Sequence, residues 1–224
     1  MNSIDPYNPL DLHALGHSLL LELERHPAHP LASVPEFVGS GIYALYYRGS
    51  ADPYRVLGQY NEKIPKIPIY IGRSRDTGAR QGLNPFEPVT KKLLYARVAE
   101  HRRSIESVDN LRVEDFAVRV LVVMPIWIPL AEVMAIRQYQ PVWNSVLQGF
   151  GIHAPGSGRQ GQKMSDWDLV HPGRAFAKRL QGRATRSRAE LLARLRAACS
   201  DAVGRHSLLE QDIAESRRQP PRPR

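Results

Sequence analysis

Two short glycine-containing stretches decide the fold of this chain: Gly39-Ser-Gly-Ile-Tyr-Ala-Leu-Tyr-Tyr47 and Ile67-Pro-Ile-Tyr-Ile-Gly72. The first begins at glycines and is rich in aromatic and apolar residues. The second is a short apolar run that ends on glycine. Both patterns are typical of β-strands. Tyr43 and Tyr70 are separated by 26 residues, which excludes a tight hairpin, so we expect residues 48–66 to form a loop or an insertion.

A helix, a strand and a second helix are predicted after these two stretches. Apolar residues recur at helical spacing within residues 91–108, at Leu94, Val98, Ile105 and Val108. Residues 112–123 show the two-residue alternation of side chains that is typical of a strand. A helix is expected to begin near Pro129 and to end at Pro141, with an apolar arc formed by Leu130, Val133 and Ile136. The order strand, strand, helix, strand, helix predicts a small α+β layer rather than an alternating parallel sheet.

The segments outside this core predict an N-terminal arm and a basic extension. Residues 10–25 have the leucine spacing of an amphipathic helix, and the proline-rich residues 26–35 read as a linker. Ser187 and Glu190 form a capping box before a helix that we expect to end near Val203. The predicted organisation is a helical arm (1–38), a core (39–147), a glycine-rich basic loop with a C-terminal helix (148–216) and a disordered basic tail (217–224).

Charge is concentrated in the last third of the chain. The net charge is +9, and 25 of the 31 basic residues are arginine. Residues 1–144 carry 16 Lys and Arg against 15 Asp and Glu, whereas residues 145–224 carry 15 against 7. This asymmetry favours a polyanionic partner, and arginine favours nucleic acid because its guanidinium binds phosphate and guanine in a bidentate manner. A GC-rich genome, which raises the arginine content of its proteins, is the alternative explanation.

Membrane insertion and cysteine chemistry are not expected. The longest apolar run, Val120–Ala131, has 12 residues and contains two prolines, which is too short to span a bilayer. The N-terminus lacks the pattern of a secretory signal. The single cysteine, Cys199, can form neither an internal disulfide nor a cysteine-ligated zinc cluster. We therefore expect a cytoplasmic protein without a membrane partner.

Three polar residues lie where the helical patterns predict apolar ones. Arg97 and His101 fall on the apolar face of the helix in residues 91–108, where a guanidinium needs a partner or a function. An internal ion pair beside a core histidine is an equally good interpretation. Glu132 lies in the next helix among apolar neighbours. It could complement the helix dipole, or it could bind Mg²⁺ together with phosphate oxygens.

Gly41-Ile42-Tyr43 and Tyr70-Ile71-Gly72, followed in order by the Arg helix, a strand and the Glu helix, resemble the GIY-YIG nuclease superfamily over residues 39–147. The chain is most similar to the GIY-YIG type II restriction endonucleases, in which a histidine follows the arginine by four residues and an asparagine follows the Glu helix. Here these residues are His101 and Asn144. The run from Trp167 to Arg174 is also similar to this branch.

The resemblance implies a catalytic set of Tyr43, Tyr70, Arg97, His101, Glu132 and Asn144. Glu132 would bind Mg²⁺, for which Mn²⁺ could substitute, and Arg97 would stabilise the charge on the phosphoryl oxygens. The proton acceptor stays open between Tyr43 and His101, because ionising a tyrosine at pH 7 costs about 4 kcal/mol. Taken alone, the two tyrosines could simply pack in their strands.

The implied partners are double-stranded DNA, a second copy of the chain on that DNA and a cognate DNA methyltransferase. Some members of the branch cut the palindrome CCGCGG. Candidate DNA contacts in the basic third are Arg159, Lys163, Arg174, Arg183 and Arg186; each could bind phosphate without reading sequence. The alternatives are a GIY-YIG repair or homing nuclease, or a non-catalytic DNA-binding protein on the same scaffold. The leucine stripe of residues 10–25 could serve a dimer interface or pack on its own core.

Overall fold

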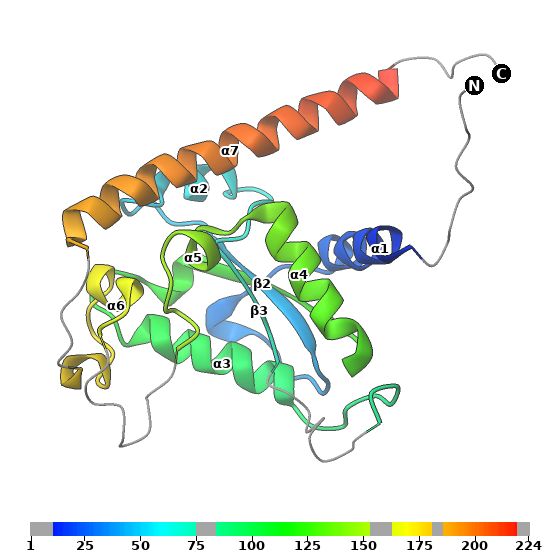
Figure 1. The fold of residues 1–224 in the computed structure, drawn as a ribbon, viewed down its shortest axis with the longest axis horizontal. Coiled ribbons are helices and arrows are strands. Elements are labelled where there is room, and N and C mark those ends of the chain that lie inside the picture. Colours follow the sequence, from blue (N-terminus) through cyan, green and yellow to red (C-terminus); the bar gives the residue numbers. More distant parts are fainter. Residues whose placement is uncertain (1–10, 75–83, 153–162, 181–185, 219–224) are drawn as a thin grey trace.

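The described residues fold around a small antiparallel sheet. This computed structural model describes residues 11–74, 84–152, 163–180 and 186–218. Within them the strands are β1 (His29–Pro30), β2 (Gly41–Tyr47), β3 (Tyr70–Arg73) and β4 (Phe116–Val122). They pair in the order β1-β4-β2-β3, and each pair is antiparallel. β2 is therefore an inner strand, whereas β3 is an edge strand that lies between α3 and α4 in Figure 1.

Helices cover both faces of the sheet. They are α1 (Leu12–Arg25), α2 (Arg55–Tyr60), α3 (Leu93–Glu106), α4 (Ile128–Tyr139), α5 (Val142–Ser145), α6 (Asp166–Val170) and α7 (Arg188–Arg218). Short 3₁₀ turns occur at Leu31–Ser33, Val113–Asp115, Pro125–Trp127 and Ala177–Arg179. α1 and α4 pack against the face that carries Ile42, Ala44 and Tyr46. The opposite face, with Tyr43, Leu45 and Tyr47, packs against α3 and the C-terminal elements.

This two-sided cover explains why all seven residues of β2 are buried. A strand that is covered on both faces loses the alternation of apolar and polar residues that marks a half-exposed strand. The predicted α+β class is confirmed, and so is the order strand, strand, helix, strand, helix. β2 and β3 pair directly, with Leu45 opposite Tyr70 and Tyr43 opposite Gly72, although a long insertion separates them in the sequence.

Two segments that the sequence predicts as linker and loop contain regular structure. β1, within the predicted linker 26–35, pairs with β4, and Leu31 beside it is fully buried. The insertion 48–66 contains α2, whose Leu57 is fully buried and which packs against α7. Tyr54 and Leu57 of the insertion thus belong to the core.

Two predicted apolar faces are shifted. In α1 the buried residues are Gly16, Leu20 and Leu23, whereas Leu12 is 63% exposed. Gly16 permits close contact with Met134 of α4. α1 therefore packs on the core of its own chain, but of the predicted leucine stripe only Leu23 is fully buried. In α4 the buried residues are Ile128, Ala131, Ala135 and Tyr139. The predicted arc is therefore wrong at Val133, which is 52% exposed, whereas Ile136 is half-buried and packs against the core, and Leu130 is half-buried.

The C-terminal helix begins as predicted and extends further. Glu190 donates its backbone N–H to Ser187 Oγ at 3.2 Å, and Leu191, Leu195 and Cys199 are buried on one face. α7 runs to Arg218, beyond the expected end near Val203, along one side of the molecule in Figure 1. Residues 219–224 of the predicted tail lie outside the described residues. No helix in the described ranges is long and apolar enough to cross a membrane.

Candidate active site

The two tyrosines of the strand motifs lie on the same face of the sheet. The ring centroids of Tyr43 and Tyr70 are 6.1 Å apart. Gly72 lies opposite Tyr43 in the β2–β3 register, and a Cβ atom at Gly72 would lie 2.3 Å from Tyr43 Oη. The glycine therefore leaves the space that the tyrosine hydroxyl occupies, which explains why a strand interior carries a glycine here.

α3 brings Arg97 and His101 to these tyrosines. The His101 ring centroid lies 5.5 Å from that of Tyr43 and 5.2 Å from that of Tyr70. Arg97 donates from Nη1 to Glu100 Oε2 at 2.9 Å and from Nη2 to the carbonyl oxygen of Gly151 at 3.0 Å. The internal ion pair and the buried histidine of the alternative interpretation are thus both present, but next to the two tyrosines rather than in isolation.

Burial keeps both tyrosine hydroxyls protonated. The pKa of Tyr43 is raised well above its ordinary value by burial and further by Tyr70, while the positive charge of Arg97 opposes the shift. Burial also raises the pKa of Tyr70, Arg97 lowers it, and the negative charge of Glu132 raises it. Within the described residues, Tyr43 Oη makes no hydrogen bond of ordinary geometry, and its polar neighbours are Tyr70 and Arg97.

Glu132 projects from α4 near the other side of the edge strand. Its carboxylate forms an ion pair with Arg73 of β3 at 3.1 Å (Nε to Oε2), and its side chain is 25% exposed. Glu132 lies beyond the first turn of α4. The interaction of a charge with the helix dipole falls off within that turn, so dipole complementarity does not explain the residue.

Asn144 in α5 binds the backbone of β3 between Tyr70 and Gly72. Its Oδ1 accepts from the Ile71 N–H at 2.8 Å, and its Nδ2 donates to the Ile71 carbonyl oxygen at 2.9 Å. An edge strand leaves backbone N–H and C=O groups unpaired on its outer side. Asn144 forms hydrogen bonds with both of these groups of Ile71. The side chain therefore fixes the strand that carries Tyr70.

The family model of the Eco29kI GIY-YIG domain matches residues 35–198, which is most of the chain. The chain belongs to this family. The Eco29kI family is one of GIY-YIG type II restriction endonucleases, so the protein is a nuclease of the restriction endonuclease kind that binds double-stranded DNA. GIY-YIG nucleases usually use divalent metals. No curated protein matches the chain.

One expected DNA contact of this Eco29kI-family chain lies in the interior. The Arg174 side chain is 4% exposed and pairs with Asp168. Its guanidinium donates to that carboxylate and to three backbone carbonyls, so no N–H group is left for a phosphate. Arg174 is therefore withdrawn from the predicted DNA contacts. Lys163 is exposed, and Arg186 is half-exposed and paired with Asp166; Arg159 and Arg183 lie outside the described residues.

Sequence reasoning missed three residues that contact the candidate site of this Eco29kI-family chain. Arg73 directly follows the second strand motif, and this position could have indicated that its side chain lies near the site. Phe150 stacks on His101, with ring centroids 4.3 Å apart. Gly151 supplies the carbonyl that accepts from Arg97. Phe150 and Gly151 belong to an irregular segment, where no periodic pattern indicates which way a residue faces.

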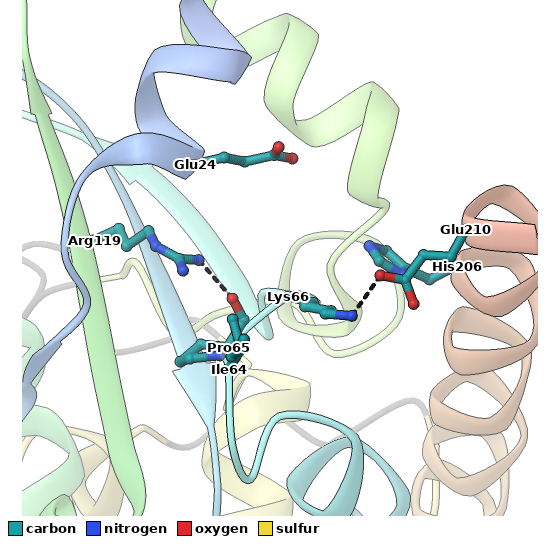
Figure 2. Close-up of a pocket in the computed structure, with 7 residues that line it drawn as sticks. All are labelled: Glu24, Ile64, Pro65, Lys66, Arg119, His206 and Glu210. Atoms are coloured by element: carbon teal, nitrogen blue, oxygen red, sulfur yellow. Dashed lines mark hydrogen bonds and ion pairs between the residues drawn. The ribbon is translucent and has the colours of Figure 1, made fainter. Parts of the chain in front are cut away.

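A separate cavity of about 230 Å³ lies between the end of α1, residues 64–66 and α7 (Figure 2). Its charged groups already have partners, and Glu24 accepts a hydrogen bond from the Tyr139 hydroxyl. Lys66 pairs with Glu210, and Arg119 donates to the carbonyl oxygens of His26 and Pro65. None of the residues that line it belongs to the tyrosine, arginine and glutamate cluster of this Eco29kI-family chain.

Proposed function

We propose that this chain is a type II restriction endonuclease that hydrolyses phosphodiester bonds at a specific palindromic site in double-stranded DNA and depends on Mg²⁺. The observation that carries the proposal is the convergence of Tyr43, Tyr70, Arg97 and His101 at the edge strand, with Glu132 near its other side. The family match favours this function over a repair or homing nuclease.

The donor set fits a magnesium ion that is completed by DNA. Among the described residues there is no group of three or more His, Cys, Asp or Glu side chains that could hold a metal ion. Mg²⁺ commonly uses one or two carboxylates and takes its other ligands from water and phosphate, and the partly exposed Glu132 can provide the one. When bound, the ion would polarise a phosphate oxygen and stabilise the leaving 3′ oxygen. Arg73, which pairs with Glu132 in the free protein, has to share or release that carboxylate.

The remaining side chains would act on the phosphate and the attacking water. Arg97, fixed by Glu100 and Gly151, would stabilise charge on the phosphoryl oxygens. Tyr70 would donate a hydrogen bond to the phosphate or the water, and Tyr43 would orient the water. The raised pKa of Tyr43 makes its hydroxyl the harder group to ionise, so we assign proton acceptance to His101.

Cleavage of both strands of a palindrome requires two such clusters, so we propose a two-fold homodimer on the DNA. The protein symmetry would then match the symmetry of the site. A cognate DNA methyltransferase would protect the host genome. Light scattering of a Glu132→Gln variant with a short cognate duplex in Ca²⁺ tests the assembly. Two chains per duplex are expected, whereas a persistent one-to-one complex of a protein that cuts both strands would contradict the dimer.

A cleavage assay with a matched glutamate control tests the proposed metal ligand. Glu132→Gln should abolish cleavage in Mg²⁺ and leave DNA binding largely intact, because one ligand serves the metal rather than the bases. Glu114, which lies on the surface with its side chain 63% exposed, provides the control, and Glu114→Gln should cut at the rate of the unmodified protein. Cleavage by Glu132→Gln at that same rate would remove Glu132 from the site.

A further inference from the structure

The Arg174 guanidinium is saturated by partners inside the protein. Nε and Nη2 donate to the two carboxylate oxygens of Asp168 at 2.6 and 2.7 Å. Nη1 donates to the carbonyl oxygens of Phe150 at 3.1 Å and Ile152 at 3.0 Å, and Nη2 also donates to that of Gly149 at 3.0 Å. These bonds use all five N–H groups that a guanidinium has.

The segment of residues 149–152, which provides the carbonyl oxygens that bind Arg174, also contacts the proposed catalytic residues. Three of its four carbonyl oxygens bind Arg174, and the fourth, that of Gly151, accepts from Arg97 Nη2 at 3.0 Å. The Phe150 ring stacks on the His101 ring with an interplanar angle of 27°. A Cβ atom at Gly151 would lie 2.8 Å from Tyr70 Oη. The segment thus lies between Arg174 on one side and Arg97, His101 and Tyr70 on the other.

Aromatic rings and a serine enclose the Arg174–Asp168 pair that binds the segment. Trp167 and Phe176 lie over the guanidinium, with ring centroids 4.5 and 4.8 Å from its Cζ atom. Ser165 donates from Oγ to Asp168 Oδ2 at 2.6 Å and fixes the carboxylate. A buried ion pair commonly contributes little net stability, because desolvation of two charges offsets their attraction. Positioning is the better explanation for this one.

We propose that Arg174 and Asp168 are positioning residues that set Arg97 and His101 for phosphodiester hydrolysis through residues 149–152. The inference rests on the proposed function, because it assigns Arg174 a task in the same site. It also replaces the expectation that Arg174 binds DNA. A loss of the guanidinium fork would let the segment shift, which would move the Arg97 side chain and the His101 ring together.

Arg174→Lys is the test, because lysine keeps the charge and loses the planar fork. The affinity for a cognate duplex in Ca²⁺ should stay within about two-fold, since Arg174 has no free donor for DNA. The single-turnover cleavage rate should fall about 10- to 100-fold, the scale expected when a catalytic group is displaced by about 1 Å. If Arg174 bound DNA, the substitution would instead weaken the affinity, and the loss of a phosphate contact would flatten the salt dependence of binding.

Arg119→Lys is the matched control. Arg119 is also a buried arginine, 8% exposed, that donates to backbone carbonyls and lies over an aromatic ring, that of Tyr46. Both variants should lose thermal stability, but at a temperature well below both unfolding transitions only Arg174→Lys should cut slowly. Equal losses of rate in the two variants would reduce Arg174 to a purely structural residue and overturn the proposal.

A second variant reaches the segment without disturbing the buried pair. Gly151→Ala places a methyl group against Tyr70 Oη and near Arg97 Nη2, and it should slow cleavage while the unfolding temperature stays unchanged. In a double-mutant cycle with Arg97→Lys, the loss of cleavage rate caused by Arg174→Lys should be smaller than in the unmodified protein, because both substitutions act through the Arg97 guanidinium. Full additivity, or a normal rate for both Arg174→Lys and Gly151→Ala, would refute the inference. A lack of cleavage by the unmodified protein would refute the proposed function itself.

Discussion

Replacing Tyr43 with phenylalanine should separate stability from activity. The Tyr43 side chain is fully buried, and its hydroxyl makes no hydrogen bond of ordinary geometry within the described residues, although Tyr70 and Arg97 are polar neighbours that shift its pKa. An unpaired buried polar group costs about 1–3 kcal/mol. Tyr43→Phe removes that cost and keeps the ring, so the free energy of unfolding should rise by about 1–3 kcal/mol. Cleavage should fall steeply, because the hydroxyl that would orient the water is gone.

Tyr47→Phe is a closely matched control. Tyr47 lies on the same strand and face as Tyr43 and is also fully buried, but its hydroxyl accepts a hydrogen bond from the Ala51 N–H at 2.9 Å. Its removal should lower the free energy of unfolding by about 0.5–1.5 kcal/mol. Cleavage at low temperature should be unaffected.

Urea denaturation without metal and a plasmid-nicking assay in Mg²⁺ measure the two quantities. The two substitutions should change the free energy of unfolding in opposite directions. This is the most discriminating expectation, because both substitutions keep the aromatic ring and remove only a hydroxyl. A loss of stability in Tyr43→Phe as large as that in Tyr47→Phe would mean that the Tyr43 hydroxyl has a strong partner. Near-normal nicking by Tyr43→Phe would refute the role of the hydroxyl.

Three further predictions concern the scaffold and the charge of the chain. Asn144→Ala removes two hydrogen bonds to Ile71 and should lower the free energy of unfolding by about 1–3 kcal/mol as well as slow cleavage; a stability change near zero would contradict the bracing of β3. Burial lowers the pKa of His171 to about 3, so the unfolded state binds a proton first as the pH falls below about 6.5. Stability should therefore decrease between pH 6.5 and 3, by up to about 1.4 kcal/mol per unit, and urea titrations of His171→Gln should show a shallower decrease. DNA binding should weaken with salt with a log–log slope of about −0.9 per neutralised phosphate, and a chain without residues 219–224 should give a flatter slope and the same recognised sequence.

Elements with long or distinctive patterns were predictable from the sequence. The helix around Leu94 and Val98 and the strand around Tyr43 lie where apolar periodicity and β-forming residues place them. α2 was not predictable from the sequence, because a six-residue helix contains too few turns to show a helical period. The end of α7 was missed for a different reason. Beyond Val203, none of the helix residues whose burial is described is buried, so the apolar pattern that predicts the helix stops before the helix does.

Sequence reasoning proposed the main residues of the candidate site, but it did not find the residues that hold them in place. Arg97 and His101 contradict the apolar face of their helix, and such a contradiction is visible in a sequence. The interpretation of Arg174 was wrong, because composition reports that a segment is basic but not which arginine is enclosed by Asp168 and backbone carbonyls. Long-range enclosure of this kind depends on how an irregular segment folds, and residue spacing does not encode it.

Sequencing the ends of cleaved plasmid DNA tests the central claim most directly. The unmodified protein in Mg²⁺ should yield discrete fragments whose ends all map to one short palindromic sequence, and chelation of the metal should abolish them. The Glu132→Gln protein, prepared in the same way, should leave the plasmid intact, which excludes a contaminating nuclease. Fragment ends at unrelated sequences, or intact plasmid with the unmodified protein in both Mg²⁺ and Mn²⁺, would contradict a site-specific, metal-dependent endonuclease.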